Sequence, residues 1–176
     1  MNRMGYACIN MQLSSQKPKI YTGRSMIKRT FKDKGIKYAS KLGLQNCKDL
    51  FEIIKWNKEN GFDFFRITSN LFPWCSEYKL SDMPDYNEIC EILSEAGSYA
   101  TTNDIRITSH PGPFNVLTSP HEHVVENCIK DLSTHGEVFD LMNLSRTPYN
   151  KINIHIGGAY GDKVSSMERF CENFHR

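Results

Sequence analysis

The stretch "KINIHIGGAYGDK" (Lys151–Lys163) combines the pattern of a β-strand with a histidine and a pair of glycines. Its isoleucines alternate with polar residues, which predicts a strand over Lys151–Ile156 with two unlike faces. His155 falls near the C-terminal end of that strand, and Gly157-Gly158 would let the backbone turn sharply or approach a ligand closely. A core histidine beside a glycine turn fits this segment as well as a ligand-binding histidine does. The choice between these two interpretations depends on the rest of the chain.

The same alternation of strand and helix signals runs through the whole chain. Strand patterns also cover Met4–Cys8, Asp63–Thr68 and Asp104–His110. Helical spacing of apolar residues covers four segments. They are a segment capped by Asn46 and closed by Asn60-Gly61, the segment Asp85–Ala100, a segment opened by Ser119-Pro120, and Ser165–Arg176. Four strand–helix units in succession predict an α/β protein with right-handed crossovers and a parallel sheet.

Two parallel architectures compete at this point, an open doubly wound sheet and a (β/α)₈ TIM-type barrel. No GxGxxG follows the first strand, which argues against a dinucleotide fold. Polar residues instead follow several strands, which is typical of the active-site face of a barrel. They are Asn10, Ser69-Asn70, Ser109-His110 and His155. We therefore predict a TIM-type barrel of which residues 1–176 hold the first four βα units, the N-terminal half of one domain in a protein of about 300 residues.

The composition is that of an ordinary globular protein, with 39% hydrophobic and 24% charged residues in a chain of 176. The net charge of +2 does not by itself indicate a nucleic-acid binder, but the charge is unevenly spread. Between Lys17 and Lys41, nine Lys and Arg residues accompany a single acid, Asp33. Such a segment suits the phosphates of a polyanion, although an ordinary solvated loop has the same composition.

Cysteine usage and hydropathy indicate where the protein works. The six cysteines are scattered without a CxxC pair, and Met1–Met11 lacks the continuous apolar stretch of a secretory signal. No apolar run is long enough to span a bilayer. These features predict reduced thiols, no membrane partner and an intracellular location, either the cytoplasm and nucleoid or, in a eukaryote, the nucleus.

Two histidines at the ends of neighbouring strands make the start of a metal site. Adjacent strands lie about 4.8 Å apart, so His110 and His155 could reach one divalent cation or two neighbouring ones. Glu77, in the loop after the second strand, offers a carboxylate to the same cluster. Divalent ions with such ligands suit phosphodiester hydrolysis, because they activate water and stabilise the leaving oxygen. The other histidines are predicted to lie on the surface or to cap helices: His121, His123, His135 and His175.

The segment "HPGPF" (His110–Phe114) places an aromatic ring on a proline-stiffened loop beside a candidate metal ligand. A rigid exposed ring at that place could stack on a base or wedge into a duplex. Alternatively, Phe114 folds back to cover the mouth of the barrel.

Four ordered motifs carry a resemblance to a known family. They are "MGYACIN" (Met4–Asn10), "FRITSNLFPWCSEY" (Phe65–Tyr78), "SHPGPFNVLTSP" (Ser109–Pro120) and "NIHIGGAYGDK" (Asn153–Lys163). In this order and combination they resemble the UV damage endonucleases over nearly the whole chain. The resemblance implies a TIM-type barrel with a cluster of divalent metals, often Mn²⁺, with Mg²⁺, Co²⁺ or Zn²⁺ as alternatives. It also implies an enzyme without a nucleotide cofactor that nicks duplex DNA 5′ to cyclobutane pyrimidine dimers, 6-4 photoproducts and some abasic sites.

The motif match assigns roles to single residues. His110 and His155 correspond to metal ligands of the family, and they are the candidate catalytic residues, with Glu77 as a further candidate ligand. Pro113 and Phe114 fall where the family has two residues that probe the DNA at the lesion. The other candidates for contact with DNA are Tyr6 and Asn10, which match the DNA-facing side of the first strand, together with Asn70 and Tyr160.

The chain departs from the family pattern at two places. Some members have a histidine in place of Glu77, so this ligand is either a carboxylate or lost. Members can also carry Gln-Tyr in place of Pro113-Phe114, so any lesion probing here would be apolar wedging. The family takes further Glu, Asp and His ligands and a modified Lys from strands five to eight, which lie beyond the four units predicted here.

Three functional hypotheses remain. The first is half of a UV damage endonuclease that, in the complete protein, acts as a monomer on damaged double-stranded DNA. The second is another enzyme on the same barrel, such as an endonuclease IV-like abasic nuclease or a sugar isomerase. The third is a truncated chain that binds DNA without doing chemistry.

Overall fold

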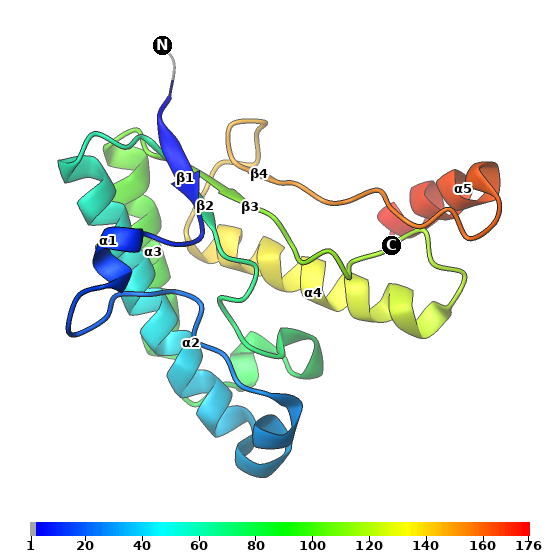
Figure 1. The fold of residues 1–176 in the computed structure, drawn as a ribbon, viewed down its shortest axis with the longest axis horizontal. Coiled ribbons are helices and arrows are strands. Elements are labelled where there is room, and N and C mark those ends of the chain that lie inside the picture. The colour runs from blue at the N-terminus through cyan, green and yellow to red at the C-terminus, as the bar shows by residue number, and fades with distance from the viewer. Residues whose placement is uncertain (1–2) are drawn as a thin grey trace.

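Four short strands lie side by side in chain order, β1-β2-β3-β4, and all of them are parallel (Figure 1). The structure is a computed structural model, and it describes residues 3–176. In the register of the sheet Gly5 lies opposite Phe64, Phe64 opposite Arg106, and Thr108 opposite Lys151. The strands are β1 (Gly5–Ala7), β2 (Phe64–Ile67), β3 (Arg106–Ser109) and β4 (Lys151–Ile152).

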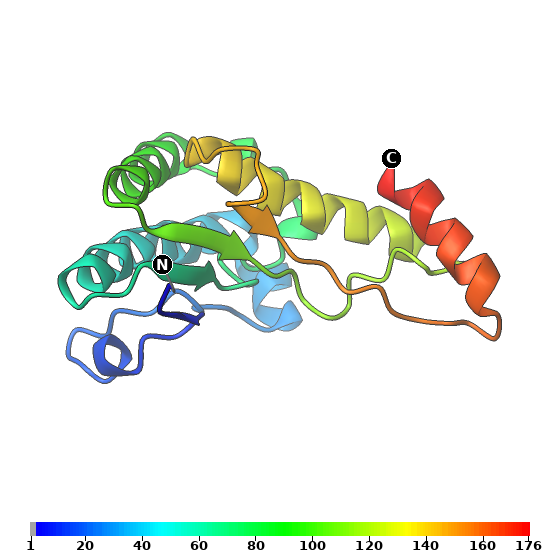
Figure 2. The ribbon, with the colours of Figure 1, turned by 90° about the horizontal axis from the view of Figure 1, so that it is seen from above.

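Helices connect each strand to the next, so each crossover returns the chain to the start of a parallel neighbour. They are α1 (Met11–Ser14), α2 (Lys28–Glu59), α3 (Tyr86–Thr102), α4 (Glu122–Leu141) and α5 (Lys163–Phe174), with short 3₁₀ turns η1 (Cys75–Glu77) and η2 (Leu80–Asp82) after β2. Figure 2 shows α2, α3 and α4 gathered behind the strands, and α5 at the far end of the segment that follows β4.

Only one face of the sheet is covered. Phe65, Ile67 and Ile107 are buried against α2, α3 and α4 and form the centre of the core. The alternate residues point to the other face and line an open groove: Phe64, Arg66, Arg106, Thr108, Lys151 and Asn153. A doubly wound sheet carries helices on both faces, whereas sequential strands covered on one face are the arrangement of a barrel wall. The structure therefore favours the barrel over the doubly wound sheet.

The predicted start of the second helix at Asn46 was wrong. The helix begins at Lys28, with a kink at Gly35 (φ 61°), so much of the basic segment is helix and not loop. Asn46 is fully buried inside it and does not cap it: its amide group donates to the Leu71 carbonyl, at 2.9 Å, and accepts from the Arg24 backbone. The sequence does not distinguish a buried Asn from an N-cap Asn, because Asn suits both positions.

The fourth strand is shorter than predicted. It ends at Ile152, and the last ladder-like bond runs from Asn153 N to Ser109 O, at 2.9 Å. The partner strand β3 stops at Ser109, and Pro111 lacks the N–H that a continued ladder would need. His110 and His155 therefore lie just beyond the regular sheet, on two extended segments that leave it together. The other boundaries differ from the predicted ones by a few residues.

Gly97 fixes how closely α3 and α4 approach. A Cβ atom at this position would lie 1.8 Å from the Met142 carbonyl oxygen at the end of α4. We expect Gly97→Ala to destabilise the chain by about 1–3 kcal/mol, because backbone and not a flexible side chain would have to move. The matched control is Gly136→Ala on α4, where a Cβ meets nothing within 4 Å. That variant should be stabilised by about 0.5–1 kcal/mol through helix propensity. Urea unfolding of both variants checks the opposite signs.

Two further predictions concern the whole chain. All six cysteines are free thiols within residues 3–176, as their scattered positions predicted. In the same part of the chain, no helix is both long and apolar enough to cross a bilayer.

Candidate metal and nucleic-acid site

The structure brings the two predicted histidines together. The rings of His110 and His155 lie edge to face, with their centroids 4.5 Å apart and their planes at 79°. His110 follows β3 directly, and His155 lies three residues beyond β4. Both occupy the same phase of the strand alternation as Thr108 and Asn153, which line the uncovered face. The histidine pair thus sits where the open face of the sheet meets the carboxyl ends of its strands.

A hydrogen bond fixes the tautomer of His110. Its Nδ1 lies 2.9 Å from the backbone carbonyl oxygen of Pro111. A carbonyl can only accept, so Nδ1 carries a proton, and in the neutral ring Nε2 keeps a free lone pair. Metal-binding histidines commonly use this arrangement, in which a carbonyl orients the ring through one nitrogen and leaves the other for the ion. His110 therefore has a ring nitrogen that is free of protein partners among the described residues, with the His155 ring beside it.

Glu77 does not complete a three-ligand cluster in the described part of the chain. It lies exposed at the end of η1, and within residues 3–176 no three His, Cys, Asp or Glu side chains gather closely enough to hold a metal ion. Two imidazoles are only part of the ligand set of a divalent ion. A complete site would therefore need ligands other than His110 and His155. The assignment of Glu77 as one of them stays a prediction.

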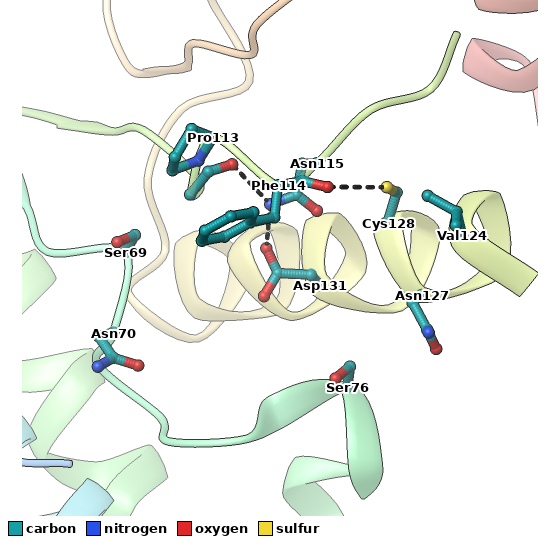
Figure 3. Close-up of a pocket in the computed structure, with 11 residues that line it drawn as sticks. Ser69, Asn70, Ser76, Pro113, Phe114, Asn115, Val124, Asn127, Cys128 and Asp131 are labelled. Carbon is teal, nitrogen blue, oxygen red and sulfur yellow. Dashed lines mark hydrogen bonds between the residues drawn. The ribbon is translucent and has the colours of Figure 1, made fainter. Parts of the chain in front are cut away.

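A groove opens at the loop that follows His110 in the chain. It has a volume of about 540 Å³ and lies between the loop after β2, the loop after β3 and α4 (Figure 3). Its lining includes Ser69, Asn70, Ser76, Pro113, Phe114, Asn115, Asn127 and Asp131. The Phe114 ring is 89% exposed, so it does not fold back over the barrel mouth. The structure thus presents a solvated aromatic ring on the rim of this groove.

Three side chains hold the Phe114 loop in place. Asn115 donates from Nδ2 to Asp131 Oδ2, at 2.6 Å, and to the Gly112 carbonyl, at 3.1 Å. Cys128 accepts from the Val116 backbone N–H at 3.0 Å. Asp131 also accepts from the buried Cys75 thiol, at 3.1 Å, which ties α4 to the loop after β2. These bonds tie the loop beneath the ring to α4.

His135 was predicted to lie on the surface, and this was wrong. It is 8% exposed, and its Nδ1 lies 2.8 Å from the hydroxyl of Ser109, the residue before His110. Its Nε2 faces Asp131 Oδ2 at 3.8 Å. The helical spacing of Cys128, Asp131 and His135 could have revealed this role, because it places all three on the face of α4 that contains the buried Val125 and Val138.

Burial lowers the pKa of His135, with the neighbouring Asp131 opposing the shift and His110 adding to it. A histidine whose folded-state pKa is depressed contributes stability that is present above its unfolded pKa of about 6.5 and is lost as pH falls toward the folded value. We expect the free energy of unfolding, measured with urea in metal-free buffer, to fall between pH 7.5 and pH 5. The fall should be smaller in His135→Gln, and His121→Gln on the surface should match the unchanged chain.

The predicted DNA-facing residues of the first strand are engaged inside the protein. Tyr6 donates its hydroxyl proton to Asn57 Oδ1 and accepts from Asn10 Nδ2, at 2.7 Å. Asn10 is 5% exposed and also caps α1 by accepting from Leu13 N. This network explains both residue types by packing alone, and their contact with DNA stays a prediction.

The other two candidates are accessible. Asn70 is exposed on the groove wall, whereas Tyr160 is 46% exposed in the loop after His155. Gly158 in that loop has φ +80° and a Cβ there would meet the Tyr160 ring, which accounts for one of the two glycines after His155. Nothing lies within 4 Å of a Cβ placed at Gly157. The space beside Gly157 leaves room for the close approach of a ligand.

The chain matches the family model described as UV-endonuclease UvdE over residues 2–176. The chain belongs to the UvdE family. Within this family it is 34% identical over 177 residues to the UV-damage endonuclease of Schizosaccharomyces pombe and 33% identical over 173 residues to the UV DNA damage endonuclease of Clostridium perfringens. The alignments cover 99% and 98% of this chain, but 29% and 39% of those two relatives. The family resemblance read from the four motifs is confirmed.

A solved structure supports the same fold. The crystal structure of SacUVDE superimposes with a TM-score of 0.81 and 31% sequence identity, covering 98% of this chain and 55% of that one. The predicted α/β fold, the first four βα units of a TIM-type barrel, is confirmed by this match. The chain spans about half, or less, of the length of these UvdE relatives.

Proposed function

We propose that this chain supplies half of the active site of a DNA repair endonuclease, which nicks duplex DNA on the 5′ side of UV photoproducts and some abasic sites. The observation that carries the proposal is the His110–His155 pair, followed in the chain by a groove-lining loop that presents the exposed Phe114 ring. The pair suits a metal that acts on a phosphodiester, and the ring suits a distorted base step. No feature of comparable strength favours a sugar isomerase.

A divalent cation is part of this proposal. His110 and His155 would hold it through one ring nitrogen each, and Mn²⁺ is the first candidate, with Mg²⁺, Co²⁺ and Zn²⁺ as alternatives. When bound, such an ion supplies Lewis-acid activation of the phosphate and a more acidic water. The protein's part is to orient the two rings, through the Pro111 carbonyl for His110, and to hold the Phe114 loop on α4.

The same hypothesis also predicts the oligomeric state and the location of the complete protein. The complete protein would act as a monomer on damaged double-stranded DNA inside the cell, where the six free thiols stay reduced.

The experiment incubates the complete protein with UV-irradiated or unirradiated supercoiled plasmid in MnCl₂. It follows the conversion of each plasmid to open circles. We expect conversion of irradiated plasmid only, with loss in EDTA, and an end-labelled duplex with one thymine dimer should be cut 5′ to the dimer. A fluorescence binding assay on the same irradiated duplex without metal separates recognition from cutting. Equal binding and equal cutting of both DNAs would contradict the proposal.

A further inference from the structure

The first turns of α2 carry a dense set of cations, called here the basic tract. Its members are all exposed: Lys28, Arg29, Lys32, Lys34, Lys37 and Lys41. Within residues 3–176 none of them lies within salt-bridge distance of a carboxylate. The cations further along the same helix behave differently, since Lys48 pairs with Glu88 and Lys55 with Glu52. The charge of the basic tract is therefore not neutralised inside the protein.

The basic tract lies at the amino ends of the two helical segments of α2 that meet at the Gly35 kink. Cations at the amino end of a helix oppose the macrodipole, and the first turn of α2 contains no acidic residue. Lys28 and Lys32, and then Lys37 and Lys41, are like charges four positions apart, a spacing that brings side chains together and makes them repel. A polyanion bound along this surface would relieve both effects.

Aromatic contacts attach the basic tract to one wall of the groove. Phe31 stacks on Trp74, with ring centroids 6.0 Å apart, and Lys28 Nζ lies 5.8 Å from the centre of the Trp74 ring. Trp74 also donates from its indole nitrogen to the Met26 carbonyl at 2.9 Å. Trp74 directly precedes η1, and Ser76 of η1 lines the groove.

We infer that the basic tract is a second contact surface for duplex DNA, which binds the phosphate backbone beyond the groove without reading sequence or damage. This inference rests on the proposed function, because it takes duplex DNA as the ligand. Exposed and unpaired lysines on a helix suit phosphates by charge, and they carry no means of distinguishing one base from another. The groove and Phe114 would supply recognition of the lesion, and the basic tract would supply part of the affinity for any duplex.

The test uses two triple variants that remove the same charge from the same helix. Lys28→Gln/Lys32→Gln/Lys37→Gln, the tract variant, removes three of the six cations of the basic tract, and Lys48→Gln/Lys55→Gln/Lys58→Gln, the control variant, removes three cations from the carboxyl-terminal half of α2. Binding of a fluorescent 20-base-pair duplex, irradiated and unirradiated, is measured between 50 and 200 mM KCl. We expect the plot of log K against log salt to be less steep for the tract variant, by about 2–3 in slope. Its affinity at low salt should fall by at least about tenfold, equally for both duplexes. The control variant should keep the slope of the unchanged chain.

Thermal unfolding gives a second readout. The tract variant should unfold at the same temperature as the unchanged chain or a higher one, because unfavourable charges have been removed from the start of the helix. The control variant loses two ion pairs, so its unfolding temperature should not rise. Weaker binding by a protein that is at least as stable cannot be attributed to misfolding.

The possible outcomes separate this inference from the proposed function. Equal slopes in the two triple variants, or no measurable binding of duplex at 50 mM salt, overturns the inference. A preference for irradiated duplex that persists while the slopes are equal leaves the proposed function intact. A specific loss in the tract variant without any preference for irradiated duplex supports the inference and contradicts the proposed function.

Discussion

Replacing His155 by alanine is expected to weaken binding of Mn²⁺ by at least about 100-fold and to abolish the metal-dependent nicking of irradiated DNA. Loss of residues that merely orient a ligand already costs about 10–100-fold in metal affinity, so loss of a ligand should cost at least as much. The fold should not change, because His155 is exposed and beyond the end of β4. Binding is measured by the electron paramagnetic resonance signal of free Mn²⁺, which needs no activity.

His121 provides a matched control for this variant. It is also exposed, and its ring lies 5.9 Å from that of His123, so the chain contains a second pair of neighbouring histidines. That pair lies at the start of α4. His121→Ala should bind Mn²⁺ like the unchanged chain. If the two alanine variants bind Mn²⁺ equally, the His110–His155 pair is not the metal site.

The sequence alone was sufficient to place the histidine pair. Strand alternation is a local signal, and in a parallel sheet it also fixes which residues share a face and an end. His110 and His155 each follow such a pattern, so their meeting at one edge followed from four predicted strands in chain order. The exact distance between the rings did not follow, because it depends on where the ladder between β3 and β4 stops.

Signals that depend on tertiary contacts were missed. The start of α2 is dominated by lysines, and Phe31 packs there on Trp74 and Tyr78, which are distant in the sequence. Asn46 was read as a cap, because burial of an amide within a helix leaves no mark in sequence. The hydrogen bond between Ser109 and His135 joins residues 26 positions apart. It could be predicted only if the packing of α4 on β3 were already known.

Replacing Phe114 by alanine is expected to reduce the preference of the chain for irradiated over unirradiated duplex by about 5–150-fold. A base stacked on an aromatic ring contributes about 1–3 kcal/mol by alanine substitution, and this range converts to that ratio. The Phe114 loop should stay where it is, because Asn115 and Val116 bond to Asp131 and Cys128 through groups that the substitution leaves in place. Stability should change by less than about 0.5 kcal/mol, since the ring is almost fully exposed.

Two further variants make the role of the Phe114 ring specific. Phe174→Ala removes another phenylalanine that is 60% exposed, on α5, and should leave the preference unchanged. Phe114→Leu keeps an apolar wedge but removes the flat ring, so it distinguishes wedging from stacking. If Leu preserves the preference, the side chain acts by separating two bases, because a branched aliphatic group can intercalate but has no face on which a base can stack. If Leu behaves like Ala, the aromatic face itself holds the lesion. If neither variant differs from Phe174→Ala, the Phe114 loop does not read damage, and discrimination must come from the polar walls of the groove.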